Sequence, residues 1–140
     1  MDLRMGGPVP PCLVNPREFP TIRLGSCSVG APDQNFVLGT DGRLRNCALF
    51  TQWIGDARTR SFADLVRAPG VVNYRKRAPD FCHGCAALPG CIGGCGAAAL
   101  ALTGDINALD PLVLQHTDPA FAHRVRDARL QESGLGSSTR

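Results

Sequence analysis

Long hydrophobic runs are missing from this chain of 140 residues. No stretch is long enough to span a lipid bilayer, so we do not expect a membrane protein. The first residues also lack the apolar segment of a secretory signal peptide, which makes a reducing cytoplasm the expected compartment. In that compartment, clustered cysteines indicate metal binding or catalysis more often than disulfide bonds.

Aromatic residues and lysine are also scarce. Aromatic side chains make up 6% of the sequence, there is a single lysine, and 16 glycines and 11 prolines reduce the volume available to a hydrophobic core. A metal centre compensates for such a core in many small domains. The net charge of +3 is mild, and a solvated face explains its densest basic patch, residues 74–77. Because aromatic platforms are few, nucleic acid is not an expected partner.

Cysteine, in contrast, is abundant, with seven residues in the chain. Four of them fall within residues 82–95 at the spacing C-x2-C-x5-C-x3-C: Cys82, Cys85, Cys91 and Cys95. This segment has too little apolar bulk to fold by packing, but it offers soft sulfur donors and four glycines that let the backbone turn tightly. Buried free thiols are the alternative interpretation, although cysteines that serve only packing rarely lie so close together.

The spacing leaves two kinds of metal site open. Four thiolates can bind zinc tetrahedrally, but zinc ribbons usually separate their two C-x2-C knuckles by about a dozen residues or more. Iron–sulfur clusters use sets of four cysteines with short internal spacings and a distant ligand. Because seven cysteines exceed what one site can use, two sites are the simpler interpretation, and clusters are favoured over zinc.

We expect a small, irregular α+β fold in which a β-hairpin precedes the cysteine-rich loop and short helices. The hairpin is predicted from residues 35–38 and 43–47, which flank the turn pair Asp41-Gly42. It would place Cys47 at the end of its second strand, with Leu44 facing the core. Three large apolar residues that follow are also expected in the core: Phe50, Trp53 and Ile54.

Helices are predicted on both sides of the cysteine loop. Ser61 and Asp64 have the spacing of a capping box and indicate a short helix, interrupted by Pro69-Gly70 and resumed over residues 71–75. Residues 96–103 are rich in alanine and leucine and predict a helix that Gly104 stops. Cys95 would then lie at a helix N-terminus, where backbone N–H groups favour a thiolate or a cluster.

The two ends of the chain are expected to lie outside the main domain. Residues 1–20 are rich in proline and predict a linker or a strap across the domain, with Cys12 inside it. Asp118-Pro119 predicts a last helix, with Asp as its cap and Pro at its first position. The final residues, 133–140, are predicted to be a disordered tail.

The cysteine pattern resembles that of SPASM domains, which carry auxiliary iron–sulfur clusters at the C-terminus of many radical S-adenosylmethionine peptide maturases. That family has the pattern C-x(9–15)-G-x4-C, then C-x2-C-x5-C-x3-C, then a final cysteine. Here Cys27 is followed by fourteen residues, Gly42, four residues and Cys47, and then by the loop of residues 82–95. The resemblance covers residues 21–115 and leaves 116–140 as a C-terminal helix and tail.

The resemblance implies two 4Fe–4S clusters with crossed ligands. The first would be held by Cys27, Cys47 and Cys95, and the second by Cys82, Cys85 and Cys91. Where the family ends in Asp-Pro-x-Cys, this chain has Asp110-Pro111-Leu112-Val113, so the second cluster lacks its expected fourth thiolate. That position is open, or is closed by Asp105, Asp110 or His116. Cys12 is surplus to the pattern and is available to close the first cluster, unless the strap has no part in either site.

The C-x3-C-x2-C motif that cleaves S-adenosylmethionine is absent, because Ala98 stands where a third cysteine would follow Cys91 and Cys95. The resemblance therefore implies no S-adenosylmethionine site in this chain. It implies electron transfer and docking of a peptide or protein substrate, in partnership with a radical S-adenosylmethionine barrel domain or protein and a flavodoxin or ferredoxin-type electron carrier. Two alternatives remain open: a zinc-binding interaction module without a redox role, and an enzyme that acts at an open cluster site.

Overall fold

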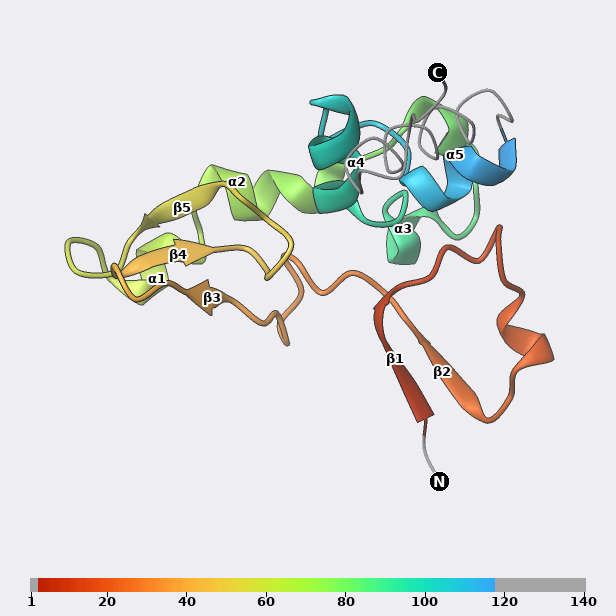
Figure 1. Ribbon diagram of the computed structural model, residues 1–140, viewed down its shortest axis with the longest axis horizontal. Helices are drawn as coiled ribbons and strands as arrows, with labels where there is room; N and C mark the ends of the chain where they lie inside the picture. Colours follow the sequence, from red (N-terminus) through yellow and green to blue (C-terminus); the bar gives the residue numbers. More distant parts are fainter. Residues whose placement is uncertain (1–2, 118–140) are drawn as a thin grey trace, which may run out of the picture.

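The computed structural model describes residues 3–117, which form a small mixed α+β fold of short elements (Figure 1). The strands are β1 Leu3–Pro8, β2 Ile22–Gly25, β3 Val37–Leu38, β4 Arg43–Arg45 and β5 Trp53–Asp56. The α-helices are α1 Phe62–Leu65, α2 Pro69–Val72, α3 Leu88–Cys91, α4 Gly96–Thr103 and α5 Pro111–Thr117. Three 3-10 turns complete the fold: η1 Pro16–Glu18, η2 Asn73–Lys76 and η3 Asp80–Cys82. The helix expected from Asp118 and the tail at 133–140 lie outside the described residues.

The predicted hairpin is confirmed. Strands β3 and β4 pair antiparallel, with Leu38 opposite Leu44, and β5 pairs antiparallel with the other edge of β4. The Gly39 N–H donates to the carbonyl of Arg43 at 2.8 Å, and Gly42 closes the turn at φ +81°, a conformation that glycine adopts without strain. Leu44 is buried, as expected, so the hairpin is anchored by its second strand.

The expectation that Trp53 is a core residue is wrong. Its side chain is 38% exposed, and the guanidinium groups of Arg43 and Arg45 lie 4.8 and 5.0 Å from its ring centroid. Side chains alternate along a strand, so Arg43 and Arg45 point to the face opposite Leu44. Trp53, directly across from Arg45 in the neighbouring strand, lies on that outer face with them. Phe50 is buried as expected, and Ile54 is partly buried.

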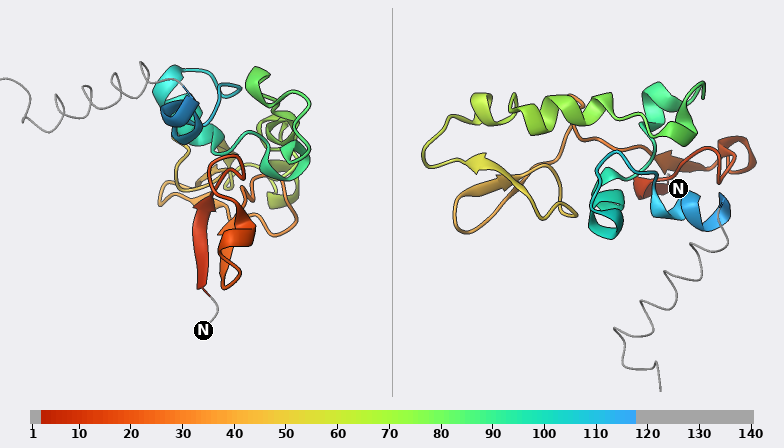
Figure 2. Two further views of the ribbon diagram at one scale, coloured as in Figure 1. Left: turned by 90° about the vertical axis from the view of Figure 1, so that its right-hand side faces the viewer. Right: turned by 90° about the horizontal axis from the view of Figure 1, so that it is seen from above.

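The helical segment after the sheet begins with the predicted cap. The Ser61 hydroxyl accepts a hydrogen bond from the Asp64 N–H at 3.1 Å and donates to the Asp64 carboxylate at 2.6 Å. Pro69 does not interrupt a helix as expected but begins one, because proline at the first helical position removes an N–H that would have no helical partner. Helix α2 then continues into η2, and together they run from the sheet towards α4 (Figures 1 and 2).

The N-terminal residues form a ribbon at the other end of an elongated molecule, beside α3 and α5 (Figure 2). Strand β1 pairs parallel with β2, with Leu3 opposite Ile22, and the Val9 N–H donates to the Gly25 carbonyl at 2.9 Å. Pro10, two residues after the end of β1, is fully buried. Within residues 3–117, no helix is long and apolar enough to cross a membrane.

The core lies between the sheet and the cysteine loop. One cluster of buried residues there consists of Val29, Phe50, Tyr74, Ile92 and Ala97. We expected residues 74–77 to form a solvated basic face, but two of these four side chains, those of Tyr74 and Arg77, are buried. Tyr74 belongs to the core and Arg77 is only 3% exposed, because η2 turns these two side chains inward.

Candidate metal centre

The cysteine loop reverses direction between Cys91 and Cys95. Helix α3 ends at Cys91, and the next three residues all have left-handed backbone angles: Ile92 at φ +50°, Gly93 at +76° and Gly94 at +80°. A β-branched residue such as Ile92 rarely adopts this conformation, and such strain is characteristic of functional sites. The turn separates the last thiol of α3 from the thiol that begins α4.

The first thiol group consists of Cys27, Cys47 and Cys95, which all pack against the core cluster. The Tyr74 hydroxyl connects two of their segments, because it accepts the Cys27 thiol proton at 3.4 Å and the Gly96 N–H at 3.0 Å. The ring of Tyr74 packs edge-on against Phe50, with centroids 5.5 Å apart, and the Phe50 N–H donates to the carbonyl of Cys47 at 3.3 Å. Three cysteines from distant parts of the chain therefore surround one aromatic pair.

Burial raises the pKa of both Cys95 and Tyr74, but backbone N–H groups oppose that rise at Cys95. Burial raises the pKa of the Cys95 thiol, and the backbone N–H groups of Ala98 and Ala97, at the start of α4, act in the opposite direction. Cys95 is the N-terminal capping residue of this helix, as the sequence predicts, so its sulfur lies where N–H groups favour negative charge. Burial, followed by the bond with Cys27, raises the pKa of Tyr74, which therefore remains a neutral phenol at physiological pH.

The second thiol group lies on the other side of the left-handed turn. A small cavity of about 50 Å³ is lined by four cysteines and mostly apolar neighbours: Cys12, Cys82, Cys85, Cys91, Pro11, Phe81, Ala87, Leu88 and Gly93. The structure thus places Cys12 with Cys82, Cys85 and Cys91, rather than in the role expected for it at the first site. All seven cysteines of the chain are free thiols.

In the second group, neighbouring cysteines raise one another's pKa, because two thiolates close together repel each other. Burial raises the pKa of Cys82, and the neighbouring thiols of Cys91, Cys12 and Cys85 raise it further. Burial likewise raises the pKa of Cys12, with smaller contributions from Cys91 and Cys85. A bound cation reverses this situation, because it favours the deprotonated form of every thiol that contacts it.

The first group offers three sulfur donors and the second offers four, and sulfur donors suit an iron–sulfur cluster as well as zinc. Among residues 3–117, no three His, Cys, Asp or Glu side chains are placed to hold a single metal ion. That finding concerns one ion. A cubane keeps its four thiolates further apart, because four irons stand between them.

The three expected candidates for the missing ligand lie differently in the structure. Asp110 is 1% exposed, and its carboxylate accepts the Cys95 N–H at 2.6 Å and the Leu112 N–H at 2.8 Å. These bonds fix the cysteine loop to the start of α5, so Asp110 has a structural role. Asp105 is exposed and accepts the Asn107 N–H at 2.8 Å, and His116 is exposed on α5.

Arg77 is a site residue that the sequence patterns did not indicate. Its guanidinium donates to the carbonyls of Ile106, Gly94 at 3.3 Å and Ala108 at 3.0 Å, and lies 5.4 Å from the Tyr74 ring centroid. A buried positive charge therefore lies against the cysteine loop, where it stabilises negative charge on nearby sulfur. In the sequence, Arg77 is the last of three consecutive basic residues after Tyr74, a pattern that does not distinguish a buried arginine from an exposed one.

Two glycines let the loop pass between buried charged side chains. A Cβ atom at Gly94 would lie 2.5 Å from the Cβ of Asp110, and one at Gly96 would lie 2.5 Å from Nη1 of Arg77. Real Cβ contacts are essentially never this short. Cys95 is therefore held between two positions that only glycine fits.

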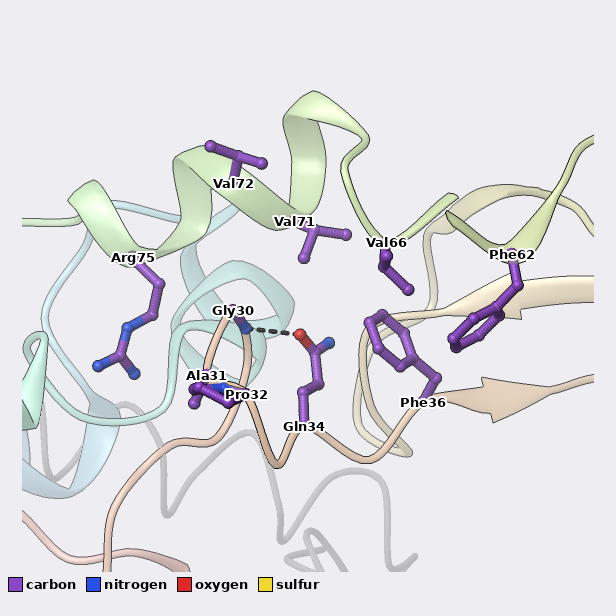
Figure 3. A pocket seen from close by; sticks show the side chains of 10 residues that line it. All are labelled: Gly30, Ala31, Pro32, Gln34, Phe36, Phe62, Val66, Val71, Val72 and Arg75. Atoms are coloured by element: carbon purple, nitrogen blue, oxygen red, sulfur yellow. Dashed lines mark hydrogen bonds between the residues drawn. The ribbon is translucent and has the colours of Figure 1, made fainter. Parts of the chain in front are cut away.

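A larger cavity of about 620 Å³ lies beside α2, outside both thiol groups (Figure 3). Phe36 and Phe62 form one end of the cavity as an edge-on pair with ring centroids 5.6 Å apart. Val71 and Val72 of α2 also line it. At the opposite end lies Arg75, whose Nη1 donates to the carbonyl of Cys27 at 2.9 Å. The cavity is therefore connected to the first thiol group through one side chain.

No protein-family model matches this chain, and neither a curated protein nor a solved structure matches it. The chemistry of the site therefore rests on its own residues. Those residues form two groups of thiols, one around Tyr74 and one around the small cavity.

Proposed function

We propose that this chain is an iron–sulfur protein of the SPASM type, which binds two 4Fe–4S clusters and serves a radical S-adenosylmethionine maturase. One observation carries the proposal: the seven cysteines fall into two groups, one of three thiols and one of four, divided by the turn between Cys91 and Cys95. Such a division matches two clusters better than one zinc ion. We propose the cytoplasm as its compartment, because cysteine ligands must stay reduced and the cytoplasm is a reducing environment.

The clusters would supply one-electron transfer, and the chain's residues would hold and tune them. Cys27, Cys47 and Cys95 would hold the first cluster within the core, and Cys82, Cys85 and Cys91 would hold the second. Hydrogen bonds to sulfur, burial and nearby charge are the features by which a protein sets a cluster's potential. At the first site these are supplied by the Tyr74 hydroxyl and by the N–H groups at the start of α4, and at the second site the charge of Arg77 favours the thiolate form of Cys82.

The larger cavity is the proposed docking place for an apolar part of a peptide substrate. Its walls are mostly aromatic and aliphatic, as in peptide-binding pockets generally. Because Arg75 connects it to the backbone of Cys27, a docked substrate would lie next to the first site. Radical formation would occur in a barrel domain or partner protein, with a flavodoxin or ferredoxin-type carrier removing the electron.

Iron content tests the proposal. Anaerobic reconstitution of the full chain with iron and sulfide, followed by desalting, is expected to leave about eight irons and about eight sulfides per chain, from two clusters of four irons. The loaded protein should be brown, and its reduced form should show the electron paramagnetic resonance of two clusters. The matched control is a variant with all seven cysteines replaced by alanine, which should retain no iron.

Two results would overturn the proposal. If zinc binds tightly while iron and sulfide do not, the chain is a zinc-binding module. If about four irons are retained in one cluster type, only one group of thiols is a cluster site.

A further inference from the structure

The N-terminal strap brings an additional thiol to the second group. Cys12 lines the same cavity of about 50 Å³ as Cys82, Cys85 and Cys91. We infer that Cys12 is the fourth thiolate of the second cluster and replaces the missing cysteine at position 113. The inference rests on the proposed function, since it assigns a ligand to a cluster that the proposal places there.

The strap holds Cys12 in this position from both sides. Before it, β1 pairs with β2 and Pro10 is fully buried. After it, the N–H groups of Leu13 and Val14 donate to the Pro10 carbonyl at 3.0 and 3.4 Å, which closes a tight turn. Cys12 therefore lies on a turn whose first residue is anchored in the protein.

A second cavity shows that the strap lies against α3 over more than one residue. This cavity, of about 420 Å³, is lined by Val9, Pro11 and Pro16 of the strap, by residues 22–26, and by Ala87, Gly90 and Cys91. Pro11 lines both cavities, so the strap passes between them directly before Cys12. The strap and the cysteine loop therefore line two cavities together.

Residues 110–113, which correspond to the segment that supplies the fourth ligand in SPASM domains, offer no thiol in this chain. Val113 is 1% exposed, within helix α5, and is absent from the residues that line the thiol cavity. Asp110 is engaged by the N–H groups of Cys95 and Leu112. A thiolate is also a better match for cluster iron than a carboxylate. Cys12 is thus the donor best suited to complete the shell.

Iron retention in a Cys12→Ala variant of the full chain tests the inference. Wild type should hold about eight irons in two 4Fe–4S clusters. In Cys12→Ala the first cluster should behave as it does in wild type, because its ligands are unchanged, and the second should lose one iron and give the oxidised 3Fe–4S resonance, or be lost, leaving about seven or about four irons per chain. The matched control is Val14→Ala, which changes a neighbouring strap residue and should load like wild type.

Two results would contradict the inference. If Cys12→Ala matches wild type in iron content, resonance and persistence in air, Cys12 is not a ligand. If it instead loses the same cluster as Cys47→Ala, Cys12 belongs to the first site.

A measurement on metal-free protein separates this inference from the proposed function. Mild oxidation of the reduced chain by diamide, which accepts the two electrons and two protons of each disulfide formed, should join Cys12 to Cys82, Cys85 or Cys91, as read by peptide mass spectrometry. Joining mainly to Cys27 or Cys47 would overturn the placement of Cys12. Failure of wild type to take up iron would instead overturn the proposed function, whichever disulfide forms.

Discussion

Replacing Cys95 with alanine is expected to remove a different cluster from the one removed by replacing Cys91, although only three residues separate the two. Cys95→Ala should retain about four of about eight irons, and Cys91→Ala, which leaves three thiolates at the second site as Cys12→Ala does, should retain about seven or about four. The reason is the left-handed turn over residues 92–94, which leaves Cys95 against the core with Cys27 and leaves Cys91 at the small cavity. Iron analysis with electron paramagnetic resonance of the reduced proteins measures which cluster survives.

Partner cysteines provide matched controls for this pair. Cys47→Ala should give the same surviving resonance as Cys95→Ala, and Cys85→Ala the same as Cys91→Ala. Combining Cys95→Ala with Cys47→Ala should cause no further loss of iron, because both act on one cluster. If Cys95→Ala and Cys91→Ala keep the same survivor, the crossed assignment of the two thiol groups is wrong.

Replacing Gly94 with alanine is expected to destabilise the domain by about 3 kcal/mol, since it combines two separate costs. The backbone at φ +80° disfavours any residue with a Cβ, and that Cβ would lie 2.5 Å from the Cβ of Asp110, which is itself buried. In a domain of this size the apparent melting temperature should fall by about 15 °C. Thermal unfolding under anaerobic conditions, with each variant in the same loading state, is the measurement.

Two glycines of the same loop separate the two costs. Gly84 has φ +77°, but no atom lies within 4 Å of the point where a Cβ would stand, so Gly84→Ala should cost only about 1 kcal/mol, from backbone strain. Gly90 lies in α3 with no such atom within 4 Å, so Gly90→Ala should leave the melting temperature unchanged or slightly raised. Equal melting temperatures for Gly94→Ala and Gly84→Ala would show that Asp110 does not confine the loop.

Tyr74, Arg77 and Asp110 together fix the position of Cys95. Arg77 and Asp110 contact the backbone of the loop at Gly94 and Cys95, and Tyr74 contacts both Cys27 and Gly96. A change at any of these three side chains therefore alters the position of Cys95 as well as the charge around it. This connection explains why a loop with so little apolar bulk has a defined shape.

Local signals in the sequence determined several elements correctly. The Asp41-Gly42 turn, the Ser61 cap and the alanine-rich segment closed by Gly104 depend on neighbours a few residues apart, so the sequence alone predicts them. Helix α5 carries the same kind of signal in Asp110-Pro111, an acidic cap followed by proline, which we interpreted only as part of the family pattern. The spacing of the cysteines likewise predicts metal chemistry without any structure.

Tertiary structure alone brought Cys12 to the second thiol group and decided which charged residues are buried. Cys12 lies with Cys82, seventy positions away, and the Tyr74 hydroxyl meets the thiol of Cys27 across forty-seven. Trp53 is exposed because it lies on the outer face of its sheet. Arg77 is buried because its guanidinium binds carbonyl groups of residues distant in the sequence. Contacts over such separations depend on how short elements pack together, and periodicity within a few residues carries no information about that packing.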